Sequence, residues 1–252
     1  MIDLQNKTAL VTGGSRGVGR AVAQLLARAG ARVGITYRSR QQEAEQTLQI
    51  IRAEGSEGWA HQIDFSDESK MPDLFARVDR EFPGGLDLFI ANAGIWPPED
   101  ESIEQMEYQR WRHTLRVNLD SVFLATQEAG KRMRHSGRIV YVGSTAGQRG
   151  EAFHVDYAAT KGAMISMVKG LCVEYAARDI TVNCVAPGWI DTEMSNIPYA
   201  DGGLERISKS IPLGRVASAE DVAGPIIFLC SHLARHITGE VLNINGGAIL
   251  CG

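Results

Sequence analysis

The stretch Thr8-Ala-Leu-Val-Thr-Gly-Gly-Ser-Arg-Gly-Val-Gly19 decides the fold of this chain. Its first four residues form a short apolar run typical of a buried parallel strand, and a glycine-rich turn follows directly. Apolar residues then recur at helical spacing from Val18 to Ala29, and a second strand-like run extends from Arg32 to Tyr37. A strand, a turn, a helix and a strand in this order predict a βαβ unit.

The glycine-rich turn is suited to hold a phosphate group. Glycines let the backbone approach a ligand closely, and the start of the following helix offers free N–H groups and a positive dipole end. The spacing T-G-x-x-x-G-x-G differs from the common G-x-G-x-x-G fingerprint, but the order of elements around it is the same. The alternative is a glycine-rich turn that binds no ligand. We expect a dinucleotide here, held by Gly13, Ser15, Arg16, Gly17, Val18 and Gly19.

The alternation of helices and strands continues along the chain. Further helices are expected over 41–54, 67–82, 101–134, 155–177 and 219–231, and further strands over 59–64, 87–92, 138–143, 180–186 and 241–244. Seven strands alternating with helices predict an α/β fold, a single Rossmann-type doubly wound sheet of parallel strands with helices on both faces. No linker, repeat or shift in composition divides the chain, so residues 1–252 are interpreted as one dinucleotide-binding and catalytic domain.

Residues that follow directly on predicted strands are of particular interest. In doubly wound sheets, ligands bind in the crevice at the carboxyl ends of the strands. Six scattered residues of this chain are therefore expected to meet at one crevice, namely Gly13, Tyr37, Asp64, Asn92, Ser144 and Pro187.

Composition and charge limit the possible partners. The 252 residues are 44% hydrophobic and 22% charged, which is ordinary for a globular protein. A net charge of −4, with Lys and Arg spread along the chain, argues against nucleic acid and against an anionic membrane as partners. The first residues carry charges where a signal peptide needs an apolar stretch, so we expect a soluble, cytoplasmic protein.

Four cysteines are present, Cys172, Cys184, Cys230 and Cys251, and none belongs to a C-x-x-C motif. Buried or incidental thiols are the simplest interpretation. We expect no disulfide and no metal site.

The pair in Tyr157-Ala-Ala-Thr-Lys161 indicates proton-transfer chemistry. On a helix the two side chains stand at i and i+4, on one face. A free phenol titrates near pH 10, and a fixed ammonium favours the phenolate, so we expect Lys161 to move the pKa of Tyr157 towards the working range. Ser144 ends an apolar run, and its hydroxyl could hold a carbonyl oxygen that the tyrosine also contacts. The spacing of the pair is not specific alone, and its weight comes from the motifs around it.

In this order, the motifs make the chain similar to the short-chain dehydrogenase/reductase family, and within it to the 3-oxoacyl-[acyl-carrier-protein] reductase branch. The resemblance covers nearly the whole length. It is carried by Thr12 to Gly19, Asp64, Asn92-Ala-Gly94, Asn118, Ser144, Tyr157 with Lys161, Pro187-Gly188 with Thr192, and Thr238 to Gly247.

The resemblance implies roles for four catalytic residues. Tyr157 would exchange a proton with the substrate oxygen, and Lys161 would lower its pKa and hold the nicotinamide ribose. Ser144 would orient the carbonyl, and Asn118 would hold the water of a proton relay. The alternative for Asn118 is an ordinary helix residue.

The resemblance also implies the remaining cofactor contacts. Asp64 with Phe65 would contact the adenine, Asn92, Ala93 and Gly94 would line the adenine ribose, and Pro187, Gly188, Ile190 and Thr192 would close over the nicotinamide amide. The alternative for Asp64 is a cap at the end of a strand.

The residues after the second strand bear on which cofactor is bound. An NAD enzyme normally has Asp or Glu there to accept the ribose 2′-hydroxyl, whereas this chain has Tyr37 and Arg38, with no carboxylate nearby before Glu43. The guanidinium groups of Arg38 and Arg16 suit a 2′-phosphate instead. We therefore expect NADP(H) in preference to NAD(H). The alternative is that both arginines are simply solvated.

The function we expect is NAD(P)-dependent interconversion of a small-molecule ketone and a secondary alcohol, in the direction of NADPH-dependent carbonyl reduction. One alternative is 3-oxoacyl thioester reduction, but carrier-protein reductases often have an arginine where Leu171-Cys-Val-Glu174 has Val173. An alternative of another class is a non-catalytic NADP-binding sensor or scaffold.

The family usually forms tetramers, so a homotetramer through 101–134, 155–177 and the last strand is expected. Aromatic residues such as Trp96 and Trp189 in the substrate segments favour an apolar or aromatic substrate.

Overall fold

The seven predicted strands are present and form one sheet in the computed structural model, which describes residues 2–250. They are β1 (Thr8–Val11), β2 (Arg32–Tyr37), β3 (Gly58–Gln62), β4 (Leu86–Ala91), β5 (Met133–Val142), β6 (Thr181–Pro187) and β7 (Val241–Ile244). Every neighbouring pair is parallel, and the order across the sheet is β3-β2-β1-β4-β5-β6-β7. The chain order reverses between β1 and β4, which places a topological switch point there. The predicted α/β fold is therefore confirmed.

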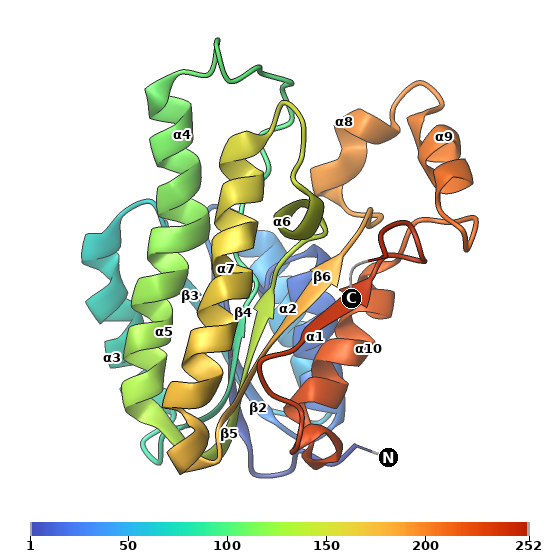
Figure 1. The fold of residues 1–252 in the computed structure, drawn as a ribbon. Coiled ribbons are helices and arrows are strands. Elements are labelled where there is room, and N and C mark those ends of the chain that lie inside the picture. The colour runs from blue at the N-terminus through green and yellow to red at the C-terminus, as the bar shows by residue number, and fades with distance from the viewer. Residues whose placement is uncertain (1, 251–252) are drawn as a thin grey trace.

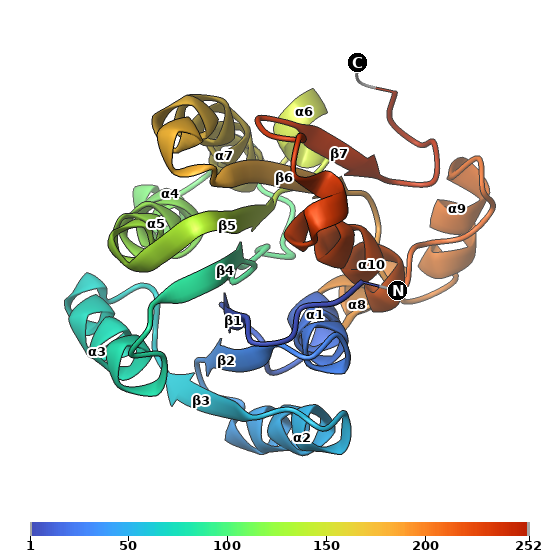
Figure 2. The same cartoon turned by 90° about the horizontal axis from the view of Figure 1, so that it is seen from below.

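Helices cover both faces of the sheet. They are α1 (Gly17–Arg28), α2 (Gln41–Ala53), α3 (Met71–Glu81), α4 (Tyr108–Leu115), α5 (Ser121–Arg132), α6 (Ala146–Arg149), α7 (Val155–Glu174), α8 (Asn196–Tyr199), α9 (Gly203–Ser210) and α10 (Ala219–Cys230). Short 3₁₀ turns lie at Glu68–Lys70, Ala176–Arg178, Glu193–Ser195 and His232–Ala234. Helices α1, α2 and α10 cover one face, and α3, α5 and α7 cover the other (Figure 1, Figure 2).

Two apolar clusters, one on each face, explain why the strands have continuous apolar sequences. One joins α1 and α10 to the sheet through Val22, Leu26 and Ile226. The other joins α3 and α7 to it through Phe75 and Val168. Because both faces of a parallel sheet are buried, its strands need apolar side chains on both sides rather than on alternate residues.

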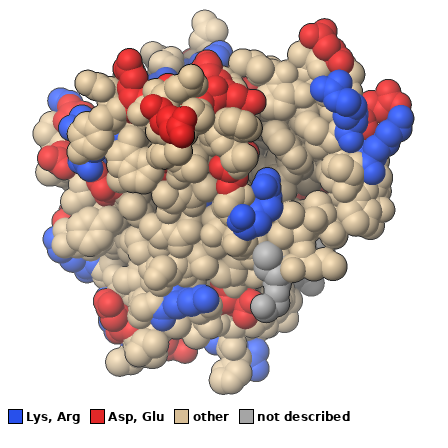
Figure 3. All heavy atoms as spheres, turned by 45° about the horizontal axis from the view of Figure 1, so that its top comes forward, with Lys and Arg blue, Asp and Glu red and all other residues tan. Residues whose placement is uncertain are grey.

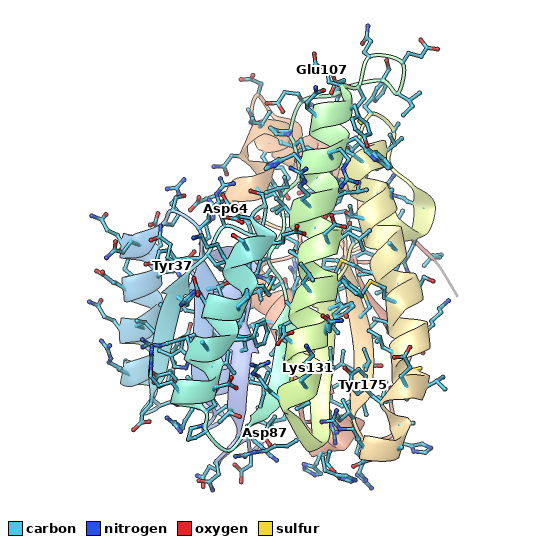
Figure 4. All side chains as sticks on the ribbon, turned by 90° about the vertical axis from the view of Figure 1, so that its left-hand side faces the viewer. Tyr37, Asp64, Asp87, Glu107, Lys131 and Tyr175 are labelled. Atoms are coloured by element: carbon cyan, nitrogen blue, oxygen red, sulfur yellow. The ribbon has the colours of Figure 1, made fainter. Side chains whose placement is uncertain are left out.

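The long helix expected over 101–134 is wrong in two respects. The helix begins only at Tyr108, because Glu101 is drawn into a turn in which its N–H bonds the Phe153 carbonyl at 3.2 Å. A π-helical turn, η2 (Arg116–Asp120), then lies between α4 and α5. The two helices nonetheless continue in one direction, as the rod from Glu107 to Lys131 shows (Figure 4).

Asp87 holds the amino ends of the strands together, at the opposite edge from Tyr37 and Asp64 (Figure 4). Its side chain is almost completely buried. It accepts hydrogen bonds from the Thr8 N–H at 3.0 Å, from Lys7 at 3.2 Å and from Arg134 at 3.1 Å. This carboxylate therefore ties β1, β4 and β5 together away from the carboxyl edge.

A segment between β6 and α10 leaves the sheet and returns to it. Ile190 pairs with Ala217 in an isolated parallel bridge, which closes the base of this excursion. Helices α8 and α9 lie within it and stand at the upper right above the end of β6 (Figure 1). The segment thus rises beside the carboxyl edge of the sheet, where the sequence predicts the ligand site.

Within residues 2–250, no helix is long and apolar enough to cross a membrane. In the same range, no group of three or more His, Cys, Asp or Glu side chains could hold a metal ion. Cys172, Cys184 and Cys230 are free thiols, and Cys251 lies outside the described residues.

Candidate active site

One cavity of about 780 Å³ opens at the carboxyl edge of the sheet. Loops after β1, β2, β3, β4, β5 and β6 surround it, as the switch-point rule predicts. The predicted site residues that line it are Gly13, Ser15, Arg16, Gly17, Val18, Gly19, Tyr37, Arg38, Asp64, Phe65, Asn92, Ala93, Gly94, Ser144, Tyr157, Lys161, Pro187, Gly188, Ile190 and Thr192. Of the predicted site residues, Asn118 is the one that does not line the cavity.

The glycine-rich turn has a backbone that side chains would obstruct. Gly13 has φ of 68°, a left-handed conformation that favours glycine. A Cβ on Gly19 would come within 2.2 Å of the Gly13 carbonyl oxygen, so the turn could not keep its shape with any larger residue there. Asn92 fixes the turn from β4, because its Nδ2 donates to the Thr12 carbonyl at 2.9 Å and to the Gly13 carbonyl at 3.1 Å.

The start of α1 offers unsatisfied donors to the cavity. Arg16 stands at the N-cap and makes no side-chain cap, and the first turn contains no acidic residue. The first N–H groups of a helix have no partner within the helix, and together with the dipole they favour an anion. A close-fitting glycine turn, open helix donors and a cavity of this volume fit a dinucleotide with its pyrophosphate at α1.

Ser144, Tyr157 and Lys161 meet at the inner wall of the cavity. The Ser144 hydroxyl lies close enough to the Tyr157 phenol to lower its pKa, and it accepts a hydrogen bond from the Ala146 N–H at 3.1 Å. Lys161 stands one turn after Tyr157 on α7, with its Nζ 5.6 Å from the centre of the phenol ring. The ammonium is 2.8 Å from the Val142 carbonyl, to which it donates. Two elements, β5 and α7, thus position three reactive groups.

The two ionisable groups of this set are shifted in opposite directions by the same cause. Burial raises the pKa of Tyr157 to about 12, and the Ser144 side chain offsets only part of that rise. Burial lowers the pKa of Lys161 to about 8. In the protein alone, the effect of burial on the Tyr157 pKa is the larger one, and the Lys161 ammonium is turned to a backbone carbonyl, so the lowering of this pKa by Lys161 stays a prediction.

Asn118 is fully buried in the π-helical turn and is paired with the backbone of Ile95. Its Nδ2 donates to the Ile95 carbonyl and its Oδ1 accepts from the Ile95 N–H, both at 2.8 Å. A Cβ on Gly94 would lie 3.2 Å from the Asn118 Oδ1 and 3.7 Å from the Lys161 Nζ, so this turn lies against both side chains. Since the side-chain amide is occupied, a bound water there would need a backbone group of the widened turn. Such turns are common at functional sites.

Asp64 is engaged at the end of β3. Its Oδ1 accepts from the Ser66 N–H at 2.9 Å and from the Ser66 hydroxyl at 2.8 Å. These hydrogen bonds, the backbone one first, lower the pKa of Asp64 below its ordinary value. The carboxylate therefore caps the turn and lines the cavity as well, so the two interpretations of Asp64 are compatible.

The arginines near the second strand are arranged differently from the expectation. Arg16 forms an ion pair with Glu193, which comes from the excursion after β6. No carboxylate follows the second strand along the chain before Glu43, but the fold brings one to Arg16 from 177 residues away. Arg40 also lines the cavity, and its guanidinium lies 3.1 Å from Glu43 and 3.9 Å from Glu193. Arg38 lines the cavity too.

Sequence reasoning missed Arg40 and Glu151, which both line the cavity. Arg40 follows Arg38 by two residues, and that repetition was a signal that could have been used. Glu151 had no such signal, because its place depends on the loop between α6 and α7.

Comparison with known proteins agrees with this geometry. A family model described as enoyl-(acyl carrier protein) reductase matches residues 13–248. The chain belongs to the short-chain dehydrogenase/reductase family, whose members are NAD(P)-dependent oxidoreductases acting on keto and alcohol groups.

Three similar proteins illustrate the match. The chain is 38% identical to the 3-oxoacyl-[acyl-carrier-protein] reductase FabG of Aquifex aeolicus, with 98% of each chain covered. It is 37% identical to a short-chain dehydrogenase of Burkholderia cenocepacia solved with NADP, with a TM-score of 0.91 and coverage of 97% and 98%. It is 31% identical to the promiscuous reductase LugOII, which catalyses a keto-reduction at C1 in lugdunomycin biosynthesis, with a TM-score of 0.92 and coverage of 98% and 99%.

Proposed function

We propose that this protein reduces a ketone to a secondary alcohol with NADPH, and that Tyr157 gives the proton. The observation that carries the proposal is the meeting of Ser144, Tyr157 and Lys161 in the wall of a cavity that fits a dinucleotide. The raised pKa keeps the Tyr157 phenol protonated at neutral pH, so it has a proton to give to a carbonyl oxygen.

The residues of the site divide the work of the reaction. Ser144 and Tyr157 hold the carbonyl oxygen between two hydroxyl groups, and Tyr157 gives its proton to that oxygen. Lys161 holds the nicotinamide ribose, and Pro187, Gly188, Ile190 and Thr192 cover the nicotinamide end. The reduced nicotinamide, when bound, supplies the hydride.

NADP(H) rather than NAD(H) is proposed because three arginines line the cavity near the carboxyl end of β2, where we expect the adenine ribose. These are Arg16, Arg38 and Arg40, and an arginine fork suits phosphate oxygens. A similar protein from Burkholderia cenocepacia was solved with NADP. Glu193 pairs with Arg16 and Arg40, so a 2′-phosphate would compete with a carboxylate for these groups.

Reduction of a 3-oxoacyl thioester is the second candidate. The relative from Aquifex aeolicus is named for it, and its chain matches over nearly its whole length. Against it, Val173 is exposed on α7, where carrier-protein reductases often have an arginine. Comparing a 3-oxoacyl thioester on the carrier protein with the same thioester on a short thiol tests this candidate. A preference for the carrier-bound form would support it.

We further propose one domain over residues 1–252 that acts in the cytoplasm as a homotetramer. Exposed apolar side chains on the helices of one face support assembly, among them Tyr108, Phe123 and Val173.

The face at the carboxyl edge carries small groups of charges of both signs between broad uncharged areas (Figure 3). That pattern does not suit nucleic acid.

A panel of ketones tests the proposed function directly. Consumption of NADPH, followed by its absorbance, should depend on a ketone and should yield the matching secondary alcohol. NADPH binding without turnover of any ketone would support the sensor or scaffold instead.

A further inference from the structure

The carboxyl group of Glu151 lies in the cavity wall. It takes no part in the proposed proton transfer. It follows Gly150, whose φ of 76° turns the chain after α6 towards the cavity. Ser144 and Tyr157 line the same cavity. Burial raises the pKa of Glu151, and the Glu151 charge in turn acts on Tyr157. The carboxyl thus lies near the reacting groups and is not a solvated surface side chain.

Trp96 lies beside this carboxyl group. It is close enough to Glu151 to lower the pKa of the carboxyl, against the larger rise that burial causes. The indole in turn stacks on His154, with ring centres 4.5 Å apart and an interplanar angle of 15°. Its other neighbour is Trp189, in an edge contact at 6.2 Å. The carboxyl group therefore lies beside a group of aromatic rings, Trp96, His154 and Trp189, which come from three loops.

Other charges face Glu151 as well. His154 and Arg149 act on it with positive charge, and Asp100 acts with negative charge. Arg149 is exposed and donates to the Gly150 carbonyl at 3.1 Å. The positive charges favour the ionised carboxylate, whereas Asp100 and burial disfavour it.

A carboxylate has about four acceptor positions, and Glu151 lines the cavity, so it can accept a hydrogen bond from a ligand there. Trp96 and Trp189 both line the cavity, so an aromatic ring can pack against them there. We propose that Glu151 is a substrate-binding residue, which accepts a hydrogen bond from a hydroxyl group of an aryl ketone packed on Trp96 and Trp189. This inference rests on the proposed carbonyl reduction and names the substrate class of the same site.

The test uses matched substrates, the three isomers of hydroxyacetophenone and their methyl ethers, with acetophenone as the parent ketone. The wild-type protein should prefer at least one hydroxy isomer over its ether in kcat/KM by about 10- to 100-fold, as expected for a hydrogen bond to a charged group. Glu151→Leu should still reduce acetophenone but should lose this preference, measured within the variant as the ratio of kcat/KM for a hydroxy isomer to that for its ether. Glu151→Gln, which keeps an acceptor, should retain part of the preference.

Two further measurements distinguish a failure of this inference from a failure of the proposed carbonyl reduction on which it rests. Binding of each ketone to the NADPH-loaded protein, followed by tryptophan fluorescence, should show the same preference as kcat/KM. Glu104→Leu, an exposed position outside the cavity, serves as the matched control. A wild-type protein with no preference for any hydroxy isomer, or an equal preference in Glu151→Leu, would overturn the inference. If no ketone is reduced at all, the proposed function itself fails.

Discussion

At the scale of single residues, the chemistry of this site depends on how burial shifts the pKa values of two groups, the acid Tyr157 and the base Lys161. Desolvation disfavours a charge of either sign, so it raises the pKa of the Tyr157 phenol and lowers that of the Lys161 ammonium. The phenol stays protonated throughout the neutral range. The ammonium, by contrast, loses its proton near the working pH.

Lys161 should make cofactor binding depend on pH. Its pKa is lowered from 10.5 to about 8, so its charge is present below pH 8 and is lost as the pH rises through that value. The affinity for NADPH should therefore fall across this range. The 2′-phosphate does not interfere, because a phosphate monoester has its second pKa near 6. Titrations followed by NADPH fluorescence measure the effect, and Lys161→Met should remove the step near pH 8. An affinity that is flat in the wild-type protein would speak against this role.

Arg38 should decide between the two cofactors. Replacing it by Ala should weaken NADPH binding by about 1.5–3 kcal/mol, the value for a charge-assisted hydrogen bond, and should leave NADH nearly unchanged. The measurement is kcat/KM for both cofactors. Arg52→Ala, an exposed arginine on α2, is the matched control. Equal losses for both cofactors, or a wild-type preference for NADH, would overturn the NADP assignment.

At the scale of elements, the strands could be predicted from the sequence, but the helices in the long segments between them could not all be predicted. Buried parallel strands have continuous apolar sequences, so their number and order of appearance could be predicted. The start of α4 could not, because Glu101 is held in a turn by a backbone hydrogen bond to Phe153, far along the chain. Helices α8 and α9 have no long apolar period and were also missed.

The same division applies to the site. Residues directly after strands could be assigned to one crevice, because parallel strands end at one edge. The pairing of Arg16 with Glu193 and the contact of Trp96 with Glu151 could not, since each joins segments that only the tertiary structure brings together. The rise in the Tyr157 pKa that burial causes in the protein alone was not predicted either, because spacing along a helix does not reveal how far a phenol is removed from water.

Asp87 should contribute to the stability of the sheet rather than to the reaction. Asp87→Ala leaves the buried Thr8 N–H without its acceptor and removes the ion pairs to Lys7 and Arg134. We expect a loss of about 1–3 kcal/mol in the free energy of unfolding. Denaturant titration measures it, with Glu104→Ala as the exposed control. A loss no larger than that of the control would show that this contact does not stabilise the fold.

At the scale of the whole molecule, one face of the sheet is covered by helices that keep apolar side chains in solvent. Phe123 is 53% exposed on α5, and Val173 is 73% exposed on α7. Scattered exposed apolar residues are normal, but two adjacent helices with such residues suit a contact with a second copy.

Light scattering should therefore give the mass of a tetramer at micromolar concentration. Phe123→Asp places a charge in the proposed contact and should reduce the mass to that of a smaller species. Leu233→Asp, an exposed apolar position outside these two helices, is the control that should remain tetrameric. A monomer mass for the wild-type protein would remove this expectation.

The central claim, that Tyr157 is the proton donor of a ketone reductase, is tested most directly by the single-turnover rate of Tyr157→Phe with saturating NADPH and a ketone that the wild-type protein reduces. A positioned acid contributes about 10²- to 10⁴-fold, so the rate should fall by that factor while the affinity for NADPH stays nearly unchanged. A variant that keeps more than about a tenth of the wild-type rate would contradict the claim.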